Sequence, residues 1–134
     1  MLNLLRSLLF YSGYFMAILV CGILFLPVAP LLPLPARYRL LNLYNYFILA
    51  WFRWTCGVSY RIQGRERLPQ EPCVILANHQ CEWETIYLQI LKPPVCTVLK
   101  QELLRIPIFG WGLRLLHPIG LDRTKPARAM RQVL

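Results

Sequence analysis

The sequence is poor in acidic residues and lacks paired cysteines. Asp and Glu together number 6 against 15 Lys and Arg, which leaves a formal charge of +9 over 134 residues. The 5 cysteines contain no CxxC pair, and their number is odd. A disulfide framework or a zinc site is therefore not expected, and a reducing compartment is favoured. No metal ion or cofactor is predicted.

Hydrophobic residues make up 57% of the chain, above the roughly 45–50% of a typical globular protein. Basic chains commonly bind nucleic acid, anionic membranes or acidic substrates. Here the positive charges lie between long apolar runs and form no basic stripe, which argues against nucleic acid. Anionic lipid suits both the charge and the apolar excess. The composition therefore predicts a membrane protein.

The first apolar run, residues 8–34, contains no charged side chain. The 19 residues that precede Pro27 would span about 28 Å as a helix, enough to cross a bilayer core. Pro27, Pro30 and Pro33 would end that helix. A signal peptide is the competing interpretation, but its apolar region would be too long and its cleavage site poor. We expect a retained membrane anchor.

A second apolar run covers residues 40–58 and mixes aromatic side chains with Asn42, Asn45 and Arg53. This mixture is typical of the membrane interface. The two runs predict a pair of membrane helices in residues 1–57, arranged as a hairpin that either spans the bilayer or dips into one leaflet. Arg37 and Arg39 lie between the runs, which favours a cytoplasmic connection. The predicted location is the inner (cytoplasmic) membrane, with the part of the chain that follows the two helices facing the cytoplasm.

The composition changes at residue 58, where we place the start of a second region, residues 58–134. Apolar strand-like runs alternate there with helical segments, and this pattern predicts an α/β fold with a mainly parallel sheet and flanking helices. The expected strands are 58–62, 73–77, 95–99 and 117–121. The expected helices are 83–91, a helical or turn-rich segment 107–116, and a helix that begins near residue 125.

His79 and Glu84 lie between an expected strand and an expected helix, where α/β proteins commonly form their sites. In a regular helix, side chains five residues apart point about 140° apart. The two can meet only if His79 lies in the loop and Glu84 on the first turn. The carboxylate would then orient the imidazole, and His79 would act as a general base toward an alcohol. From the spacing alone, a His that caps the helix is an equally good interpretation.

Two other neighbours of His79 are weaker candidates. Glu82 is a competing carboxylate, but its spacing favours contact only if His79 is itself helical. Cys81 suggests a Cys-His nucleophile pair, which residues so close in sequence seldom form. Farther along, Lys100 and Arg123 stand at the ends of expected strands. They either hold a phosphate between them or are simply solvated cations.

The residues so far described fall into two motifs that resemble the 1-acyl-sn-glycerol-3-phosphate acyltransferase (lysophosphatidic acid acyltransferase) family. Asn78-His79 with Glu84 resembles NHxxxxD. Residues 100–111 resemble K-x-E-L-x-x-I-P-x-F-G-W, and residues 119–123 resemble I-x-I-D-R. The likeness covers residues 60–123 well and the N-terminal runs loosely.

The resemblance implies a glycerolipid acyltransferase-like fold and the transfer of a fatty acyl group from acyl-CoA or acyl-carrier protein to the sn-2 hydroxyl of lysophosphatidate, which gives phosphatidate. It makes His79 the base and Glu84 its carboxylate partner, with no covalent acyl-enzyme. It assigns substrate binding to Asn78, Lys100, Gly110 and Arg123.

The sequence departs from the family pattern in two ways. Glu84 replaces the usual Asp, and related acyltransferases that act on lipid A resemble this form, so lipid A acylation stays an alternative. The family's third motif, of the E-G-T-R kind, should follow Arg123 by some tens of residues. We therefore expect a C-terminally truncated family member with an incomplete sheet. A catalytically inactive, membrane-associated remnant is the other alternative.

Overall fold

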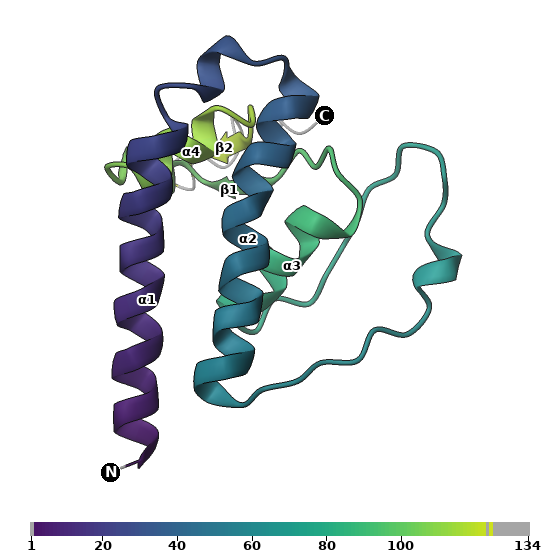
Figure 1. Ribbon diagram of the computed structural model, residues 1–134. Coiled ribbons are helices and arrows are strands. Elements are labelled where there is room, and N and C mark those ends of the chain that lie inside the picture. The colour runs from purple at the N-terminus through teal and green to yellow at the C-terminus, as the bar shows by residue number, and fades with distance from the viewer. Residues whose placement is uncertain (1, 123, 125–134) are drawn as a thin grey trace.

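The computed structural model of the chain describes residues 2–122 and 124 (Figure 1). Two long helices, α1 (Leu2–Phe25) and α2 (Leu34–Cys56), run antiparallel and side by side. A short 3-10 turn, η1 (Ala29–Leu31), lies in their connection. The Arg37 guanidinium closes the connection, because it donates to the carbonyls of Leu32 at 2.8 Å and Pro30 at 3.1 Å. The predicted helix hairpin is therefore present.

Close packing of α1 against α2 depends on a glycine. A Cβ built on Gly13 would lie 2.3 Å from Nε1 of Trp51, so only glycine lets the indole come this near. The same Nε1 donates to the Phe10 carbonyl at 3.2 Å. The Phe10 and Phe52 rings meet edge to face with centroids 5.2 Å apart. The two helices thus form one packed unit.

The outer face of α1 is apolar and uncovered. Ala17 is its one buried residue, and leucine side chains such as Leu4 and Leu5 are more than 60% exposed. By length and composition, α1 is the one helix in the described part of the chain that is able to cross a membrane. α2 carries three arginines, and its contact with a membrane stays a prediction.

The opposite face of α2 packs against α3 (Glu82–Leu91). Asn42 on α2 is buried, and its Nδ2 donates to the Gln89 carbonyl on α3 at 3.1 Å. Tyr38, one turn earlier, is also buried, and its hydroxyl lies 2.8 Å from the Val95 carbonyl and 3.0 Å from that of Leu116. The helix hairpin is therefore joined by hydrogen bonds to the rest of the chain.

A small parallel sheet completes the described fold. β1 (Val98–Lys100) pairs with β2 (Ile119–Leu121), and Lys100 lies opposite Leu121. The connection contains a 3-10 helix, η3 (Gln101–Arg105), and α4 (Phe109–Arg114), which packs on η3. The last two expected strands are thus confirmed in shortened form, as is the helical segment between them. The fold is helix-rich with a small parallel sheet.

Two expected strands, 58–62 and 73–77, are not formed in the structure. Both are extended loop, apart from a short turn, η2 (Arg65–Arg67), that lies between them. Val74 is 87% and Leu76 93% exposed. A continuous apolar run becomes a buried strand only when neighbouring strands and covering helices are supplied. Within the described residues the two existing strands pair with each other alone. The helix expected near residue 125 lies outside the described residues.

The boundary expected at residue 58 follows directly on the end of α2. Gly57 closes that helix in the left-handed conformation, with φ of 70°, as glycine commonly does at this position. The division of the chain into two domains at this point stays a prediction.

Candidate active site

The N-terminus of α3 positions the acid of the site. Cys81 is the N-cap residue and Glu84 the third residue of the helix, and together they form a capping box. The backbone N–H of Cys81 donates to Oε2 of Glu84 at 2.8 Å, and that of Gln80 donates to Oε1 at 3.2 Å. The Cys81 sulfur accepts the backbone N–H of Glu84 in return. Glu84 is therefore held by the backbone of the loop that carries His79.

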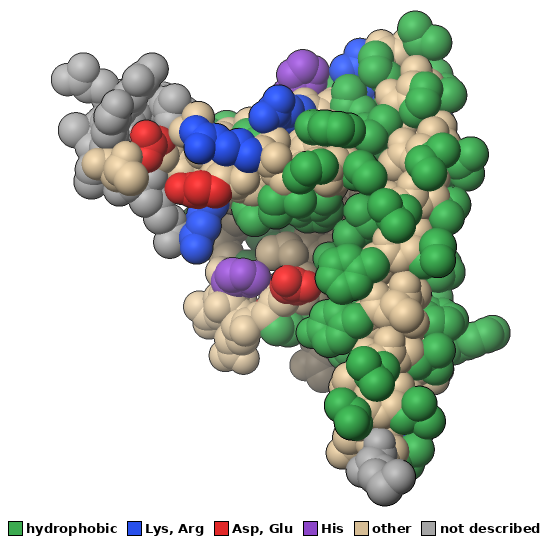
Figure 2. All heavy atoms as spheres, turned by 90° about the vertical axis from the view of Figure 1, so that its left-hand side faces the viewer, with side chains coloured by type: hydrophobic (Ala, Val, Ile, Leu, Met, Phe, Trp, Pro, Cys, Tyr) green, Lys and Arg blue, Asp and Glu red, His purple; other side chains and the backbone are tan. Residues whose placement is uncertain are grey.

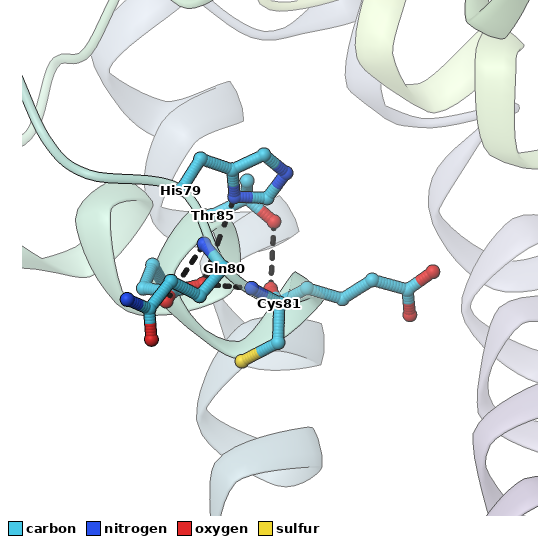
Figure 3. A network of polar contacts seen from close by, with 6 residues as sticks. His79, Gln80, Cys81 and Thr85 are labelled. Atoms are coloured by element: carbon cyan, nitrogen blue, oxygen red, sulfur yellow. Dashed lines mark hydrogen bonds and ion pairs between the residues drawn. The ribbon is translucent and has the colours of Figure 1, made fainter.

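His79 lies in the loop before α3 (Figure 3). Nδ1 of His79 is 3.6 Å from Oε2 of Glu84. The geometric prediction is confirmed: the histidine is in the loop and the carboxylate on the first turn. Of the two candidate carboxylates, Glu84 is the one that lies near His79, and the catalytic roles of the pair stay a prediction. A distance of 3.6 Å is too long for a hydrogen bond, and the His79 side chain is 63% exposed.

The electrostatics of Glu84 come mainly from the backbone. The hydrogen bond from the Cys81 N–H lowers the pKa of the Glu84 carboxyl, with smaller contributions from the Cys81 thiol and the Gln80 N–H. Glu84 is therefore a carboxylate at neutral pH and accepts protons poorly. A carboxylate in this position is able to orient the neighbouring imidazole and to stabilise an imidazolium.

Aromatic side chains support the same helix turn. The Trp83 and Tyr87 rings, four residues apart on α3, stack with centroids 5.2 Å apart. Tyr60 packs against both, at 4.8 Å from Trp83 and 5.6 Å from Tyr87. Residues 58–81 form the long connection between α2 and α3. The ring contacts of Tyr60 hold the beginning of this connection against α3, next to the capping box.

The second motif gathers at the carboxyl ends of the two strands. A cavity of about 190 Å³ opens there, lined by Gln101, Glu102, Arg105, Asp122 and Thr124. Lys100, the predicted phosphate ligand, ends β1 but does not line the cavity; Arg105 does. Arg123 lies outside the described residues. Figure 2 shows two histidine side chains on one face of the molecule, together with a group of basic and acidic side chains.

The remaining predicted ligands differ in their surroundings. Gly110 is buried, and a Cβ on it would lie 2.6 Å from the carbonyl oxygens of both Leu103 and Leu104. This close approach of α4 to η3 explains the glycine by packing, and its substrate-binding role stays a prediction. Asn78 is exposed, and its side chain has no polar contact within the described residues.

A metal site is not assembled in the described part of the chain, where no group of three or more His, Cys, Asp and Glu side chains converges. Sequence reasoning missed two features of the site. It weighed Cys81 as a nucleophile and not as a helix cap, although Cys81-Glu82-Trp83-Glu84 has the spacing of a capping box with Cys in place of Ser or Thr. It also did not propose Arg105 as a site residue. Arg105 ends the 3-10 helix η3, which no hydrophobic pattern in the sequence predicts.

Comparison with known proteins shows the family of the chain. The model of the acyltransferase family matches residues 59–134, more than half of the chain. The chain therefore belongs to the acyltransferase family.

Among its relatives is a 1-acyl-sn-glycerol-3-phosphate acyltransferase of Pseudomonas aeruginosa, 42% identical over 130 residues, which cover 96% of this chain and 51% of that protein. A protein of the same name from Limnanthes douglasii is 32% identical over 105 residues, covering 77% and 37% of the two chains. One from Saccharomyces cerevisiae is 35% identical over 75 residues, covering 55% and 25%. The chain thus spans about half the length of these curated relatives or less. No solved structure matches it.

Proposed function

We propose that this protein transfers a fatty acyl group from a thioester donor to the sn-2 hydroxyl of lysophosphatidate, giving phosphatidate. The observation that carries the proposal is the placement of His79 against Glu84 at the start of α3, with Nδ1 facing the carboxylate. The names of the similar proteins support the substrate class. The donor would be acyl-CoA or acyl-carrier protein, since both present the same thioester.

The geometry leaves Nε2 of His79 for the acceptor. With the proton on Nδ1 directed at Glu84, Nε2 is the basic nitrogen. It takes the proton of the sn-2 hydroxyl while that oxygen attacks the thioester carbonyl, and the C–S bond then breaks. The proton passes from the imidazolium to the departing thiolate. The Nδ1–Oε2 distance would shorten from 3.6 Å to hydrogen-bond length as the imidazolium forms, as catalytic hydrogen bonds commonly do.

The acceptor's phosphate would lie at the carboxyl ends of β1 and β2. Lys100 and Arg123 remain our proposed ligands, and the placement of Arg105 in the cavity at this edge adds a third cation. Asn78 and Gly110 complete the proposed substrate-binding set. A guanidinium is well suited to a phosphate because it can donate two parallel hydrogen bonds.

The helix hairpin, residues 1–57, would contact the membrane. Residues 58–134 would form the acyltransferase region. α1 presents an uncovered apolar face, whereas α3 and its charged ends lie against α2. If the hairpin crossed the bilayer upright, those charges would enter its core, at a cost of about 2.5–3.5 kcal/mol each. We therefore favour the hairpin that dips into one leaflet, on the cytoplasmic side, so that the site meets its lipid acceptor at the surface.

The test is thioester release from acyl-CoA in the presence of lysophosphatidate, measured on the 134-residue chain and its variants. His79→Ala is expected to lower the lysophosphatidate-dependent rate by about 10²–10⁴-fold, the usual contribution of a general base. Glu84→Gln is expected to lower the rate by no more than this, because Glu84 acts through His79. Glu82→Gln is the matched control, because it removes a carboxylate two residues away that does not contact His79. Equal rates for wild type and His79→Ala would refute the proposal; transfer to a lipid A precursor instead of lysophosphatidate would redirect it.

A further inference from the structure

The segment that delivers His79 is exposed and has few attachments. Residues 73–79 run past the outside of the molecule, with Val74 87% and Leu76 93% exposed. Residues 69–79 form no backbone–backbone hydrogen bond within the described part of the chain. Among the described residues, no backbone–backbone hydrogen bonds fix this extended segment in place. The position of His79 therefore depends on the contacts that hold the two ends of the segment.

The far end is held by the side chain of Lys92, at the C-cap of α3. Nζ of Lys92 donates to the Pro69 carbonyl at 2.5 Å and to the Glu71 carbonyl, and lies 3.7 Å from the Cys73 sulfur. An ammonium has three N–H donors, and each has an acceptor in the loop here. Cations are often found at helix C-termini because they favour the helix dipole, but these acceptors belong to the loop.

The near end is held at the other end of the same helix. There the Glu84 carboxylate accepts the N–H groups of Gln80 and Cys81. α3 has 10 residues, about 15 Å of axial rise, and the six steps from residue 73 to residue 79 reach about 20 Å when extended. The segment therefore runs along α3 between two anchors, one at each end of the helix.

We propose that Lys92 is a positioning residue: by tying residues 69–73 to the C-terminus of α3, it sets where His79 stands relative to Glu84. The expected loss of kcat rests on the proposed function. The expected release of residues 69–79 rests on the contacts of Lys92 alone. Loss of the ammonium frees one end of the segment, so His79 spends less time in contact with Glu84. Substrate binding at the strand ends is not touched.

The experiment compares Lys92→Met, which keeps the length of the side chain without its donors, with Lys92→Arg, which keeps charge and donors. Arg67→Met is the matched control: it removes one cation from the same loop, where the exposed guanidinium is 3.8 Å from Glu66. We expect Lys92→Met to lower kcat about tenfold or more, since misplacement by 1 Å can cost about 100-fold. KM should change less than kcat, because the proposed phosphate ligands at the strand ends are not part of the freed segment. Lys92→Arg should recover most of the rate, and Arg67→Met should match wild type.

A second measurement does not depend on activity. Cleavage within residues 69–79 by a protease of broad specificity should be severalfold faster in Lys92→Met than in wild type or Arg67→Met, because the freed segment opens more often. Equal cleavage of Lys92→Met and wild type would overturn the clamp, whatever the rates. A wild-type chain without activity, combined with faster cleavage of Lys92→Met, would refute the proposed function and leave the clamp standing. If wild type and Lys92→Met are both active with equal kcat, or if Lys92→Met loses activity only through a raised KM, the positioning role of Lys92 would be overturned.

Discussion

Two glycines in α4 provide a sharp test of the packing described above. Gly110 and Gly112 are two residues apart in one short helix, but their surroundings differ. A Cβ on Gly110 would lie 2.6 Å from two backbone carbonyl oxygens of η3, whereas a Cβ on Gly112 would meet nothing within 4 Å. Substitution by alanine should therefore shift stability in opposite directions.

The magnitudes follow from known costs. In Gly110→Ala, backbone atoms must move apart by about 0.8 Å to restore ordinary contact, and overpacking of this kind costs about 1–3 kcal/mol. Alanine's better helix propensity returns about 1 kcal/mol, so we expect a net loss of up to about 2 kcal/mol. Gly112→Ala causes no overpacking, so we expect only the gain in stability from alanine's better helix propensity, about 0.5–1 kcal/mol.

Thermal unfolding of the chain in detergent or lipid, followed by far-UV circular dichroism, measures both. With an unfolding entropy near 2.1 cal/mol/K per residue, a 134-residue chain shifts its Tm by roughly 4 °C per kcal/mol. Gly110→Ala should melt up to about 8 °C below wild type and Gly112→Ala about 2–4 °C above it. If Gly110→Ala kept the wild-type Tm and instead raised KM for the acceptor, Gly110 would be a substrate ligand and the close-approach argument would be wrong.

Two further outcomes are expected. Hydrogen bonds lower the pKa of Glu84 below its usual 4.5. The stability that the Glu84 carboxylate contributes is therefore fully present above pH 4.5 and is lost as the pH falls through the lower pKa of the folded state. At pH values below about 4.5, the Tm of wild type should decrease more steeply with falling pH than that of Glu84→Gln, and parallel curves would contradict this. Tyr38→Phe removes the one O–H that the carbonyls of Val95 and Leu116 share, which should cost about 1–3 kcal/mol of unfolding free energy. Tyr46→Phe on the exposed side of α2 should cost almost nothing, and equal chemical denaturation midpoints for the two variants would count against the contact.

Local signals predicted the helical part of the molecule well. The uncharged run before Pro27 and the aromatic run after it became α1 and α2, because helix formation needs contacts within one segment. The helix expected at 83–91 begins one residue earlier, at Glu82, and ends at Leu91. Its start is marked in the sequence by the spacing of a capping box.

The strands were predicted less well, since a strand depends on partners far away in the chain. Apolar runs at 73–77 and 95–99 look alike in sequence, yet the first is exposed loop and the second partly joins β1. Pairing of the second was decided by Ile119–Leu121, which lies in parallel register beside it. No pattern within either run distinguishes them.

The sequence by itself determined which residues meet at the start of α3. His79 and Glu84 are five positions apart across a loop–helix boundary, so short-range geometry was enough to bring them together. Tertiary structure alone decided what holds the pair: the Lys92 ammonium reaches back about 20 residues to the loop carbonyls, and Gly110 is required by a neighbouring backbone. Such contacts join groups that are distant along the chain, and the strength of each depends on a folded backbone that no local pattern encodes.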